Sequence, residues 1–485
     1  MILKHDHQSG KFGLLALLLL VSVSAWGGGQ DFRECALSHP RLSKVVNAQC
    51  MDMEVPLDYG QPQGRKIQLH VAVIPASGKA PQPDPLFFFA GGPGQSAVAS
   101  TLPMWPVFSK VLQHRDVVLI DQRGTGRSTP LKCPLEESLE LVADDALLRR
   151  KTRECLEQQQ LDVRYFTSRQ AVADVDLVRK ALGYGQINLM GVSYGTRMAQ
   201  LVLREYPERV RSIILDAVLP LEVVVGIDFA DNLAASLQKL FLHCATEDGC
   251  SQAFPELEDD WRRYLALSLD EERQMHMEHP RTGESLELEV SRQGLDAAVR
   301  MLSYASETRT LLPLLIHAAA QGDWRPLLGQ ALQVMANLEG EMSEGMHNSV
   351  VCSEDVPFYA DLPPASNRVL GRFVRQIRTL CEEWPKGESF TDIHRPLQSD
   401  VPALLLSGEV DPVTPVSYGE QALKQFSNGL HLVVPGQGHN VLPRGCVPRL
   451  AADFIEHLVL ENEETTCVQD TARLPFFIDM LGPAS

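Results

Sequence analysis

The chain has 485 residues, of which 44 are Lys or Arg and 62 are Asp or Glu, so its formal net charge is −18 with histidine neutral. That balance excludes a basic nucleic-acid binder as the default interpretation, and we expect no nucleic-acid partner. Hydrophobic residues make up 44% and charged residues 22%, close to the average for globular domains, so the chain can bury a large core. The length predicts about two to four domains, or one large fold with an insertion.

The first residues are typical of an export signal. Lys4 and Lys11 precede an apolar run at 12–23, and small residues follow it. The run is shorter than the roughly 20 residues of a membrane-spanning helix, so a signal peptide over 1–25, cleaved after Ala25, is favoured over a retained anchor. We therefore expect an exported protein, periplasmic or secreted, with no stable membrane insertion after signal removal. The signal does not distinguish these two destinations.

Ten cysteines follow the signal. An even number in an exported chain predicts disulfide bonds formed in an oxidising compartment. Ten cysteines allow roughly nine hundred pairings, which the sequence alone cannot separate, but sequential neighbours are favoured because each such pair closes a short local loop. A zinc site is a weak alternative, because no two cysteines have the spacing of a zinc knuckle and no histidine cluster accompanies them.

The first part of the exported chain alternates between strand-like and helix-like segments. Short apolar runs rich in β-branched or aromatic residues, bounded by Gly, Pro or Asp, predict strands, and helical spacing between them predicts helices. This order of elements indicates a mostly parallel sheet flanked by helices. The predicted strands lie at 67–74, 86–89, 117–120, 187–190 and 213–215, and the helices at 136–160 and 168–182.

The pattern changes after residue 219. Amphipathic helical stretches with polar connectors follow, and no segment there has a strand signal as good as those of the first part. We therefore predict a helical cap inserted into the α/β core. Its predicted helices lie at 229–243, 295–302, 308–320 and 324–338.

Strand-like runs return near the C-terminus at 403–407 and 430–434, with helices suggested at 416–426 and 447–460. An α/β core interrupted by a helical insertion explains this distribution. The predicted organisation is a signal peptide at 1–25, the N-terminal part of the core at 34–219, the cap at 220–395 and the C-terminal part of the core at 396–485.

The strongest chemical signal is a serine between two glycines. Gly191-Val-Ser-Tyr-Gly195 follows the predicted strand at 187–190 and precedes a helical stretch at 196–205. Small flanking residues permit the strained strand-to-helix turn that lifts the serine hydroxyl above the sheet. Because the motif lies in the context that it requires, Ser193 is the predicted nucleophile.

A serine hydroxyl is a poor nucleophile at neutral pH and needs a base that a carboxylate orients. His439 is the predicted base, because a short apolar strand runs into the Gly-rich loop that carries it. Asp411, after the strand at 403–407, and Asp216, at the end of the strand at 213–215, compete for the orienting role. We favour Asp411, which gives the chain order Ser, Asp, His. Asp216 would then cap a helix or anchor a loop.

Acyl transfer also needs donors for the developing oxyanion. The stretch at 87–96 runs from a strand into a glycine loop, which predicts one donor at the backbone N–H of Gly92 and a second at that of Tyr194, the residue after the nucleophile. A phosphate-binding loop is disfavoured, because the Gly-Lys-Ser/Thr ending and the dinucleotide-binding spacing are missing. Residues 121–123 follow a strand nearby and are expected to brace the site. This chemistry requires no metal and no organic cofactor.

Five motifs are spread along the predicted core: Gly-Gly-Pro-Gly at 91–94, Asp-Gln-Arg-Gly-Thr-Gly-Arg-Ser at 121–128, the serine motif, Gly-Glu-Val-Asp-Pro-Val-Thr-Pro at 408–415 and Gly-Gln-Gly-His at 436–439. Together they resemble the α/β-hydrolase serine peptidases of the prolyl aminopeptidase and tripeptidyl aminopeptidase group, over about 55–219 and about 402–477. The first two motifs are more discriminating than the serine motif, which many esterases share. The resemblance implies an α/β-hydrolase fold with a large helical cap after the sixth core strand, a tripeptidyl-aminopeptidase-like C-terminal segment, and removal of residues from free peptide N-termini.

Two departures favour the tripeptidyl branch of that group. Ala90 stands where many prolyl aminopeptidases have histidine, and the insertion is longer than a small prolyl aminopeptidase would have. Glu354 and Asp355 resemble an acidic, Cys-containing segment of that branch, so they are candidates for binding the protonated substrate amine. A solvated acidic loop beside a disulfide is the alternative, and Glu382 and Glu383 are weaker candidates.

The sequence therefore predicts an exported serine exopeptidase, an aminopeptidase of prolyl or tripeptidyl type, that acts on peptides with a free N-terminus through Ser193, His439, Asp411 and an acyl-enzyme. A carboxylesterase-type hydrolase with the same triad is the alternative, because a fold and a triad do not fix the substrate. A binding protein that keeps an inactive hydrolase fold is a third interpretation, and the intact triad argues against it. The number of residues released, any proline preference and the oligomeric state are not predicted.

Overall fold

The computed structural model describes residues 32–39, 42–133, 145–267, 273–280, 282–338, 341–359 and 373–484. The predicted signal peptide lies outside these residues, and so does the beginning of the helix predicted at 136–160. None of the helices in the described ranges is long and apolar enough to cross a membrane.

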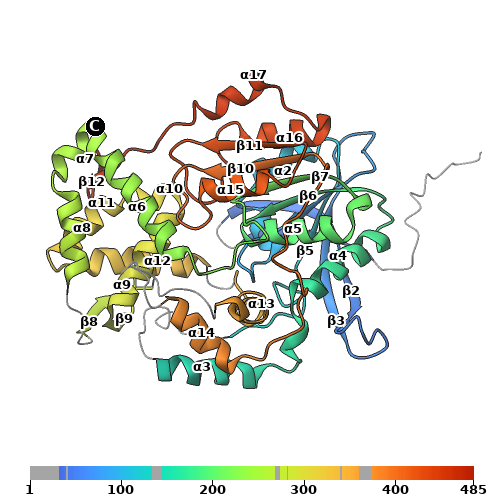
Figure 1. Cartoon of the computed structure of the whole chain (residues 1–485), viewed down its shortest axis with the longest axis horizontal. Helices are drawn as coiled ribbons and strands as arrows, with labels where there is room; N and C mark the ends of the chain where they lie inside the picture. Colours follow the sequence, from blue (N-terminus) through green and yellow to red (C-terminus); the bar gives the residue numbers. More distant parts are fainter. Residues whose placement is uncertain are drawn as a thin grey trace, which may run out of the picture.

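A nine-stranded sheet forms the centre of the molecule (Figure 1). Its strand order is β1-β2-β3-β5-β4-β6-β7-β10-β11, with antiparallel pairs from β1 to β5 and parallel pairs from β5 to β11. All seven predicted strands form, and the mostly parallel α/β arrangement is confirmed. The strands are β1 (Arg33–His39), β2 (Leu42–Pro56), β3 (Lys66–Ile74), β4 (Leu86–Phe89), β5 (Val117–Ile120), β6 (Ile187–Val192), β7 (Val210–Asp216), β10 (Ala403–Gly408) and β11 (Gly429–Val434).

Helices cover both faces of the sheet, which explains why its central strands are continuous apolar runs rather than alternating ones. In β4, Phe87 and Phe89 belong to the apolar core under α4 and α5, while Leu86 and Phe88 belong to the core under α2 and α16. All four side chains are buried. The covering helices are α2 (Trp105–Val111), α4 (Ser168–Ala181), α5 (Tyr194–Glu205) and α16 (Val447–His457).

Two strands at the N-terminal edge of the sheet were not predicted. β1 is an edge strand whose side chains are mostly exposed, and β2 pairs antiparallel with both β1 and β3. Polar residues interrupt both strands, so neither contains the uninterrupted apolar run that identifies a central strand. The disulfide between Cys35 and Cys50 joins them.

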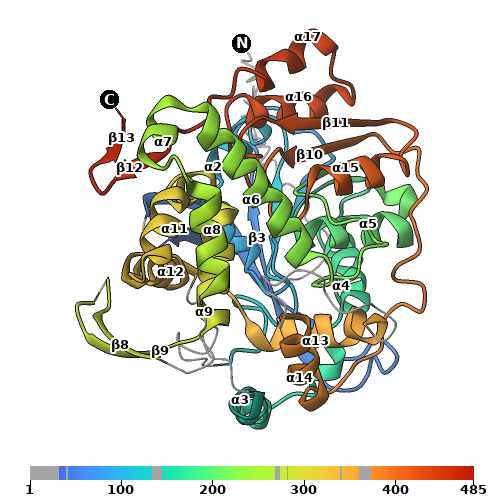
Figure 2. The same cartoon turned by 60° about the vertical axis from the view of Figure 1, so that its left-hand side comes forward.

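The chain between β7 and β10 folds into two parts rather than one (Figures 1 and 2). The first part, α6 to α12 with an antiparallel hairpin of β8 and β9, has an apolar core of its own that includes Leu237, Tyr264 and Leu302. The second part, α13 and α14, contributes residues such as Val350 and Cys381 to the core on the α4 and α5 side of the sheet. The elements of the two parts together are α6 (Phe229–Thr246), α7 (Asp248–Ala253), α8 (Leu257–Ala266), β8 (Arg273–Glu278), β9 (Ser285–Val290), α9 (Arg292–Tyr304), α10 (Ser306–Arg309), α11 (Leu312–Ala320), α12 (Arg325–Leu338), α13 (Glu344–Glu354) and α14 (Phe373–Glu383).

Three features of this region differ from the prediction. The hairpin of β8 and β9 is largely exposed, so it lacks the buried-strand signal. The helix predicted at 308–320 is two helices, α10 and α11, because Pro313 lies in the first turn of α11, where proline is tolerated but cannot continue a preceding helix. α13 and α14 were not predicted at all.

All ten cysteines are paired, each with its neighbour in the sequence, which confirms the favoured pairing. The described residues contain no free cysteine. The disulfides close loops of 6 to 29 residues. The pairs are Cys35–Cys50, Cys133–Cys155, Cys244–Cys250, Cys352–Cys381 and Cys446–Cys467.

Candidate active site

Ser193 occupies a sharp turn between β6 and α5. Its φ of 56° and ψ of −124° are strained for a residue with a side chain, as a nucleophile elbow requires. A Cβ atom on Gly191 would lie 2.2 Å from the carbonyl oxygen of Gly195, and a Cβ atom on Gly195 would lie 2.2 Å from that of Phe89. Glycine is therefore required on both sides, and the turn holds the half-buried Ser193 above the end of the sheet.

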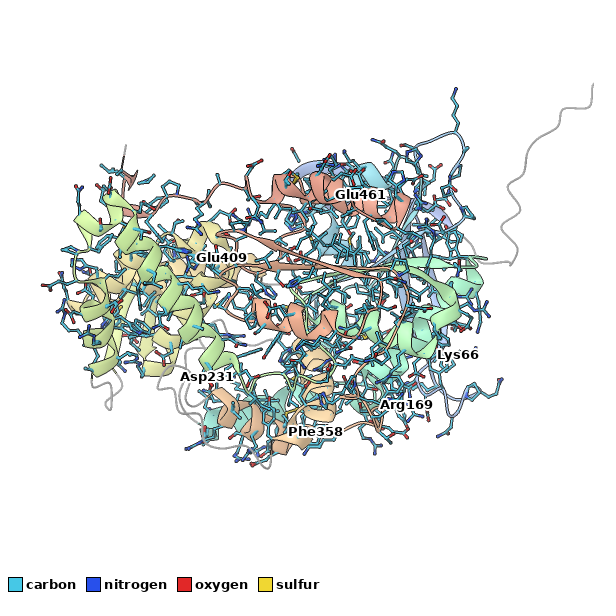
Figure 3. The ribbon with its side chains drawn as sticks, turned by 45° about the horizontal axis from the view of Figure 1, so that its top comes forward. Lys66, Arg169, Asp231, Phe358, Glu409 and Glu461 are labelled. Carbon is cyan, nitrogen blue, oxygen red and sulfur yellow. A yellow bond between two sulfur atoms is a disulfide. The ribbon has the colours of Figure 1, made fainter. Side chains whose placement is uncertain are left out.

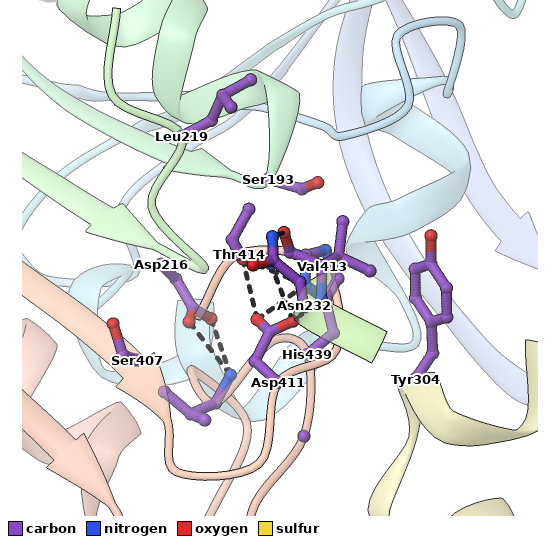
Figure 4. Close-up of polar contacts among 12 residues, drawn as sticks. Ser193, Asp216, Leu219, Asn232, Tyr304, Ser407, Asp411, Val413, Thr414 and His439 are labelled. Carbon is purple, nitrogen blue, oxygen red and sulfur yellow. Dashed lines mark hydrogen bonds and ion pairs between the residues drawn. The ribbon is translucent and has the colours of Figure 1, made fainter. Parts of the chain in front are cut away.

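His439 and Asp411 come together on two loops that follow neighbouring strands, β11 and β10. The imidazole Nδ1 lies 2.8 Å from Asp411 Oδ2, and the Asp411 side chain is fully buried. The carboxylate also accepts hydrogen bonds from the backbone N–H groups of Val413 and Thr414 and from the Thr414 hydroxyl. An acceptor-only carboxylate at Nδ1 fixes the tautomer with the proton on Nδ1 and leaves Nε2 as the basic nitrogen. Figure 4 draws Ser193 above this pair, and no dashed line joins its hydroxyl to His439. The backbone N–H of Ser193 donates to the carbonyl oxygen of Asp216 at 2.9 Å.

The electrostatic surroundings make His439 a stronger base than an ordinary histidine. Burial disfavours its charged form, but the charge and hydrogen bond of Asp411 outweigh this effect and raise the pKa of His439 above its usual value. A raised pKa favours proton transfer to the imidazole from a hydroxyl group.

Helix α9 of the cap contacts the histidine loop directly. The backbone N–H of His439 donates to the carbonyl oxygen of Tyr304 at 2.8 Å, and the Tyr304 ring meets the imidazole edge-on with 5.3 Å between ring centres. Helix α6 holds the neighbouring loop, because Lys239 donates to the carbonyl of Glu409 and Ser236 to that of Val410, both at 2.7 Å. Figure 3 labels Glu409 at this junction. The cap therefore fixes the loops that carry Asp411 and His439.

Asp216, the rival aspartate, anchors the segment that follows His439. Its carboxylate accepts hydrogen bonds from the backbone N–H groups of Val441 and Leu442, at 2.8–3.1 Å. Full burial raises the pKa of Asp216 to about 6, although these two hydrogen bonds oppose the shift. This is the loop-anchoring role that the sequence left as the alternative.

The glycine loop after β4 runs directly beside the nucleophile. A Cβ atom on Gly91 would lie only 3.2 Å from Ser193 Cβ. Gly92 has a φ of 109°, a conformation that glycine adopts readily. Tyr194 is the first residue of α5, and the first N–H groups of a helix have no partner within it. The two expected oxyanion donors therefore come from segments that flank Ser193.

Residues 121–123 brace this region, as expected. The Asp121 carboxylate accepts from the Ser96 hydroxyl and from two backbone N–H groups that follow the glycine loop and β5. Gln122 donates to the Tyr194 hydroxyl at 3.2 Å. Arg123 is fully buried and binds Asp174 through two hydrogen bonds of 2.7 Å.

Glu354 and Asp355, the candidates for amine binding, are fully buried at the end of α13. Glu354 accepts from the backbone N–H and the hydroxyl of Ser168, and this hydroxyl lies 2.7 Å from that of Tyr194. Asp355 pairs with the fully buried Arg197 of α5 at 3.0 Å and accepts from a backbone N–H at the start of the cap. In this structure both carboxylates are internal partners behind the nucleophile helix rather than exposed ligands.

Two functional neighbours had not been identified from the sequence. Thr414 supports Asp411 and could have been found from its place in the motif at 408–415. Tyr304 had no signal, because it is one aromatic residue of an amphipathic cap helix, and only the fold brings it to His439.

Comparison with known proteins finds two family models that match parts of the chain. A model of the alpha/beta hydrolase fold matches residues 84–270, and a model of TAP-like proteins matches residues 367–467. The putative hydrolase YuaR of Escherichia coli (strain K12) is 26% identical over 86% of this chain and 87% of its own length.

Two further relatives have more informative names. A tripeptidyl aminopeptidase of Streptomyces coelicolor is 29% identical over 41% of this chain, and the alignment spans 40% of that enzyme. Carboxylesterase B of Mycobacterium tuberculosis is 26% identical over 82% of each chain. The elbow at Ser193, the mostly parallel sheet and the two model matches together show that the chain has the α/β-hydrolase fold with a TAP-like C-terminal segment.

Proposed function

We propose that this protein is an exported serine peptidase that hydrolyses peptide bonds near free N-termini. Ser193 is the nucleophile, His439 the general base and Asp411 the group that orients it. The observation that carries the proposal is the 2.8 Å contact between His439 and the buried Asp411. The serine elbow is tied to the same region, because the N–H of Ser193 donates to the carbonyl of Asp216, whose carboxylate anchors the segment after His439.

The proposed reaction runs through an acyl-enzyme. His439 Nε2 accepts the hydroxyl proton as Ser193 attacks the peptide carbonyl, and the backbone N–H groups of Gly92 and Tyr194 stabilise the oxyanion that forms. The imidazolium then gives its proton to the leaving amine. Water, deprotonated by His439, hydrolyses the acyl-enzyme and frees Ser193. No step calls on a metal or an organic cofactor.

The relatives support the choice of a peptide substrate. One of them is a tripeptidyl aminopeptidase, and the C-terminal segment matches the TAP-like model. Export is supported by five disulfides in the described residues, because such bonds persist in oxidising compartments, together with the N-terminal apolar run. We propose a periplasmic or secreted location.

A panel of fluorogenic peptides tests the proposal. The acyl parts carry one, two or three residues, each with a free or an acetylated N-terminus, and the wild-type protein is compared with Ser193→Ala. Ser109→Ala, at an exposed position on α2, is the matched control. We expect turnover of free-amine peptides that is lost in Ser193→Ala and kept in Ser109→Ala. Equal turnover of acetylated peptides would refute the exopeptidase assignment, and the best acyl length would identify the branch.

A carboxylesterase is the second candidate, because a relative of that name aligns over 82% of this chain. It predicts Ser193-dependent hydrolysis of short-chain esters with no turnover of any peptide in the panel. Measuring p-nitrophenyl esters beside the peptides, with the same variants, separates the two activities.

A further inference from the structure

Helix α9 of the cap places a cation close to the proposed catalytic histidine. Arg300 is half-buried and donates to the Tyr304 hydroxyl at 2.6 Å. Its guanidinium carbon lies 5.4 Å from the centre of the Tyr304 ring, and that ring lies 5.3 Å from the imidazole of His439. Both distances are measured from the centre of the Tyr304 ring, so the guanidinium carbon cannot lie farther from the imidazole centre than the sum of the two.

Aromatic rings surround this guanidinium. Phe229 of α6 and Phe373 of α14 lie 4.8 Å and 4.9 Å from its central carbon, and Tyr304 is the third ring. Rings that stack on a guanidinium occupy its faces and leave the N–H donors at its edge free to bind a planar anion. A guanidinium has five such donors, and the Tyr304 hydroxyl takes one of them.

Another arginine on α9 has a carboxylate partner. Arg292 pairs with Asp296, four positions later, at 2.9 Å. The residue four positions after Arg300 is Tyr304, whose hydroxyl is neutral. Within the described ranges, no ion pair joins Arg300 to a carboxylate. A half-buried cation without an anionic partner is unusual, because burial of a charge is unfavourable unless it is paired.

Arg300 binds the hydroxyl end of the Tyr304 side chain. In Figure 4 the Tyr304 hydroxyl, to which Arg300 donates, points toward the level of Ser193 and away from Asp411. The Arg300 charge opposes the rise that Asp411 causes in the pKa of His439, and it adds to the larger effect of burial that lowers the pKa of His347. The cation is thus close enough to act on the reacting groups through space.

We propose that Arg300 forms a carboxylate-binding subsite of the active site. An extended peptide rises about 3.3–3.6 Å per residue, so the distances above place a bound carboxylate within about three residues of the scissile bond. That carboxylate is the C-terminus of a short peptide or the side chain of an Asp or Glu residue. The inference rests on the proposed function and specifies it further, as a preference for short or acidic peptides.

Binding to the inactive Ser193→Ala variant tests the subsite without turnover. The probes are tetra-alanine with a free C-terminal carboxylate, its C-terminal amide, and Ala-Ala-Asp-amide with its Asn counterpart, each measured by isothermal titration calorimetry. Because a charge-assisted pair is strong, we expect roughly ten- to hundredfold tighter binding of one or both carboxylates than of the neutral counterpart. The pair of probes that shows the preference identifies the source of the carboxylate.

Variants at position 300 assign the preference to this side chain. Arg300→Gln, combined with Ser193→Ala, should bind acid and amide equally, and Arg300→Lys should keep part of the preference because it keeps the charge. Arg262→Gln removes an exposed cap arginine and should change nothing. Three results would each overturn the subsite. They are equal affinity of the Ser193→Ala protein for the carboxylate and neutral probes, no measurable binding of any probe, and a carboxylate preference that survives Arg300→Gln.

Turnover by the enzyme with Ser193 intact separates the two proposals. Ser193-dependent cleavage without carboxylate preference would overturn the subsite and leave the peptidase proposal standing. Carboxylate-selective binding that is lost in Arg300→Gln, with no cleavage of any peptide, would support the subsite and refute the peptidase. If both proposals hold, Arg300→Gln should raise KM for the acidic substrate with little change in kcat.

Discussion

Replacing Asp355 with alanine separates a structural role for this residue from a role in substrate binding. Asp355 is fully buried and pairs with Arg197, which is also fully buried. The variant leaves the guanidinium with the carbonyl of Val223 as its remaining hydrogen-bond partner in the described residues, and it removes the acceptor of the Val225 N–H. Removing one partner of a buried ion pair costs about 3–5 kcal/mol, because the other charge stays buried and uncompensated. We expect Asp355→Ala to lower the free energy of unfolding by that amount.

Urea unfolding followed by circular dichroism, with the disulfides intact, measures the change. The double variant Arg197→Met/Asp355→Ala removes both charges, so it should recover much of the loss. Folded Asp355→Ala protein should keep the ratio of turnover between free-amine and acetylated peptides. A stability change below about 1 kcal/mol, together with a selective rise in KM for free-amine peptides, would refute the structural role and make Asp355 an amine ligand.

Three further predictions concern Asp216, the Asp411–His439 pair and one disulfide. Burial raises the pKa of Asp216 from 3.8 to about 6, so the folded protein loses stability as pH rises through this pKa. Asp216→Asn lacks this loss, so in urea unfolding the variant should gain about 2–3 kcal/mol of stability relative to the wild type between about pH 4 and pH 7. A difference in stability that does not depend on pH would contradict this. A general base must be neutral, so kcat/KM should fall as pH drops through the pKa of His439, which lies above about 6.5. In Asp411→Asn this acidic limb of the pH–rate profile should move to lower pH, and an unmoved limb would argue against the pairing of Asp411 with His439. Removing the 29-residue loop closure with Cys352→Ala/Cys381→Ala should cost about 3–4 kcal/mol in urea unfolding, and an unchanged midpoint would show that the bond constrains little.

The central strands and the nucleophile could be predicted because their signals are local. A strand buried on both faces is a short apolar run, as in Leu86–Phe89, and the elbow at Ser193 requires glycines two positions away on either side. β1 was missed because it is an edge strand with mostly exposed side chains, and β2 was missed because its buried and exposed residues alternate instead of forming an apolar run.

The contacts between the cap and the core could not be predicted, because they depend on pairs far apart in the sequence. Asp355 and Arg197 are 158 positions apart, and nothing near Asp355 distinguishes a buried ion pair from a solvated acidic loop. Tyr304 and Arg300 meet the region of His439 only through the packing of α9 against the histidine loop. Local sequence patterns thus identified the catalytic residues, while the residues that contact them could be identified only from the folded structure.

The disulfides join cysteines in strict order along the chain, and the longest loop closes 29 residues. A chain oxidised as it emerges N-terminus first would meet each native partner before any later cysteine arrives. Mixed pairs that need thiol–disulfide exchange would then be rare. Maturation in an oxidising compartment should therefore depend on a thiol oxidase and proceed without a disulfide isomerase.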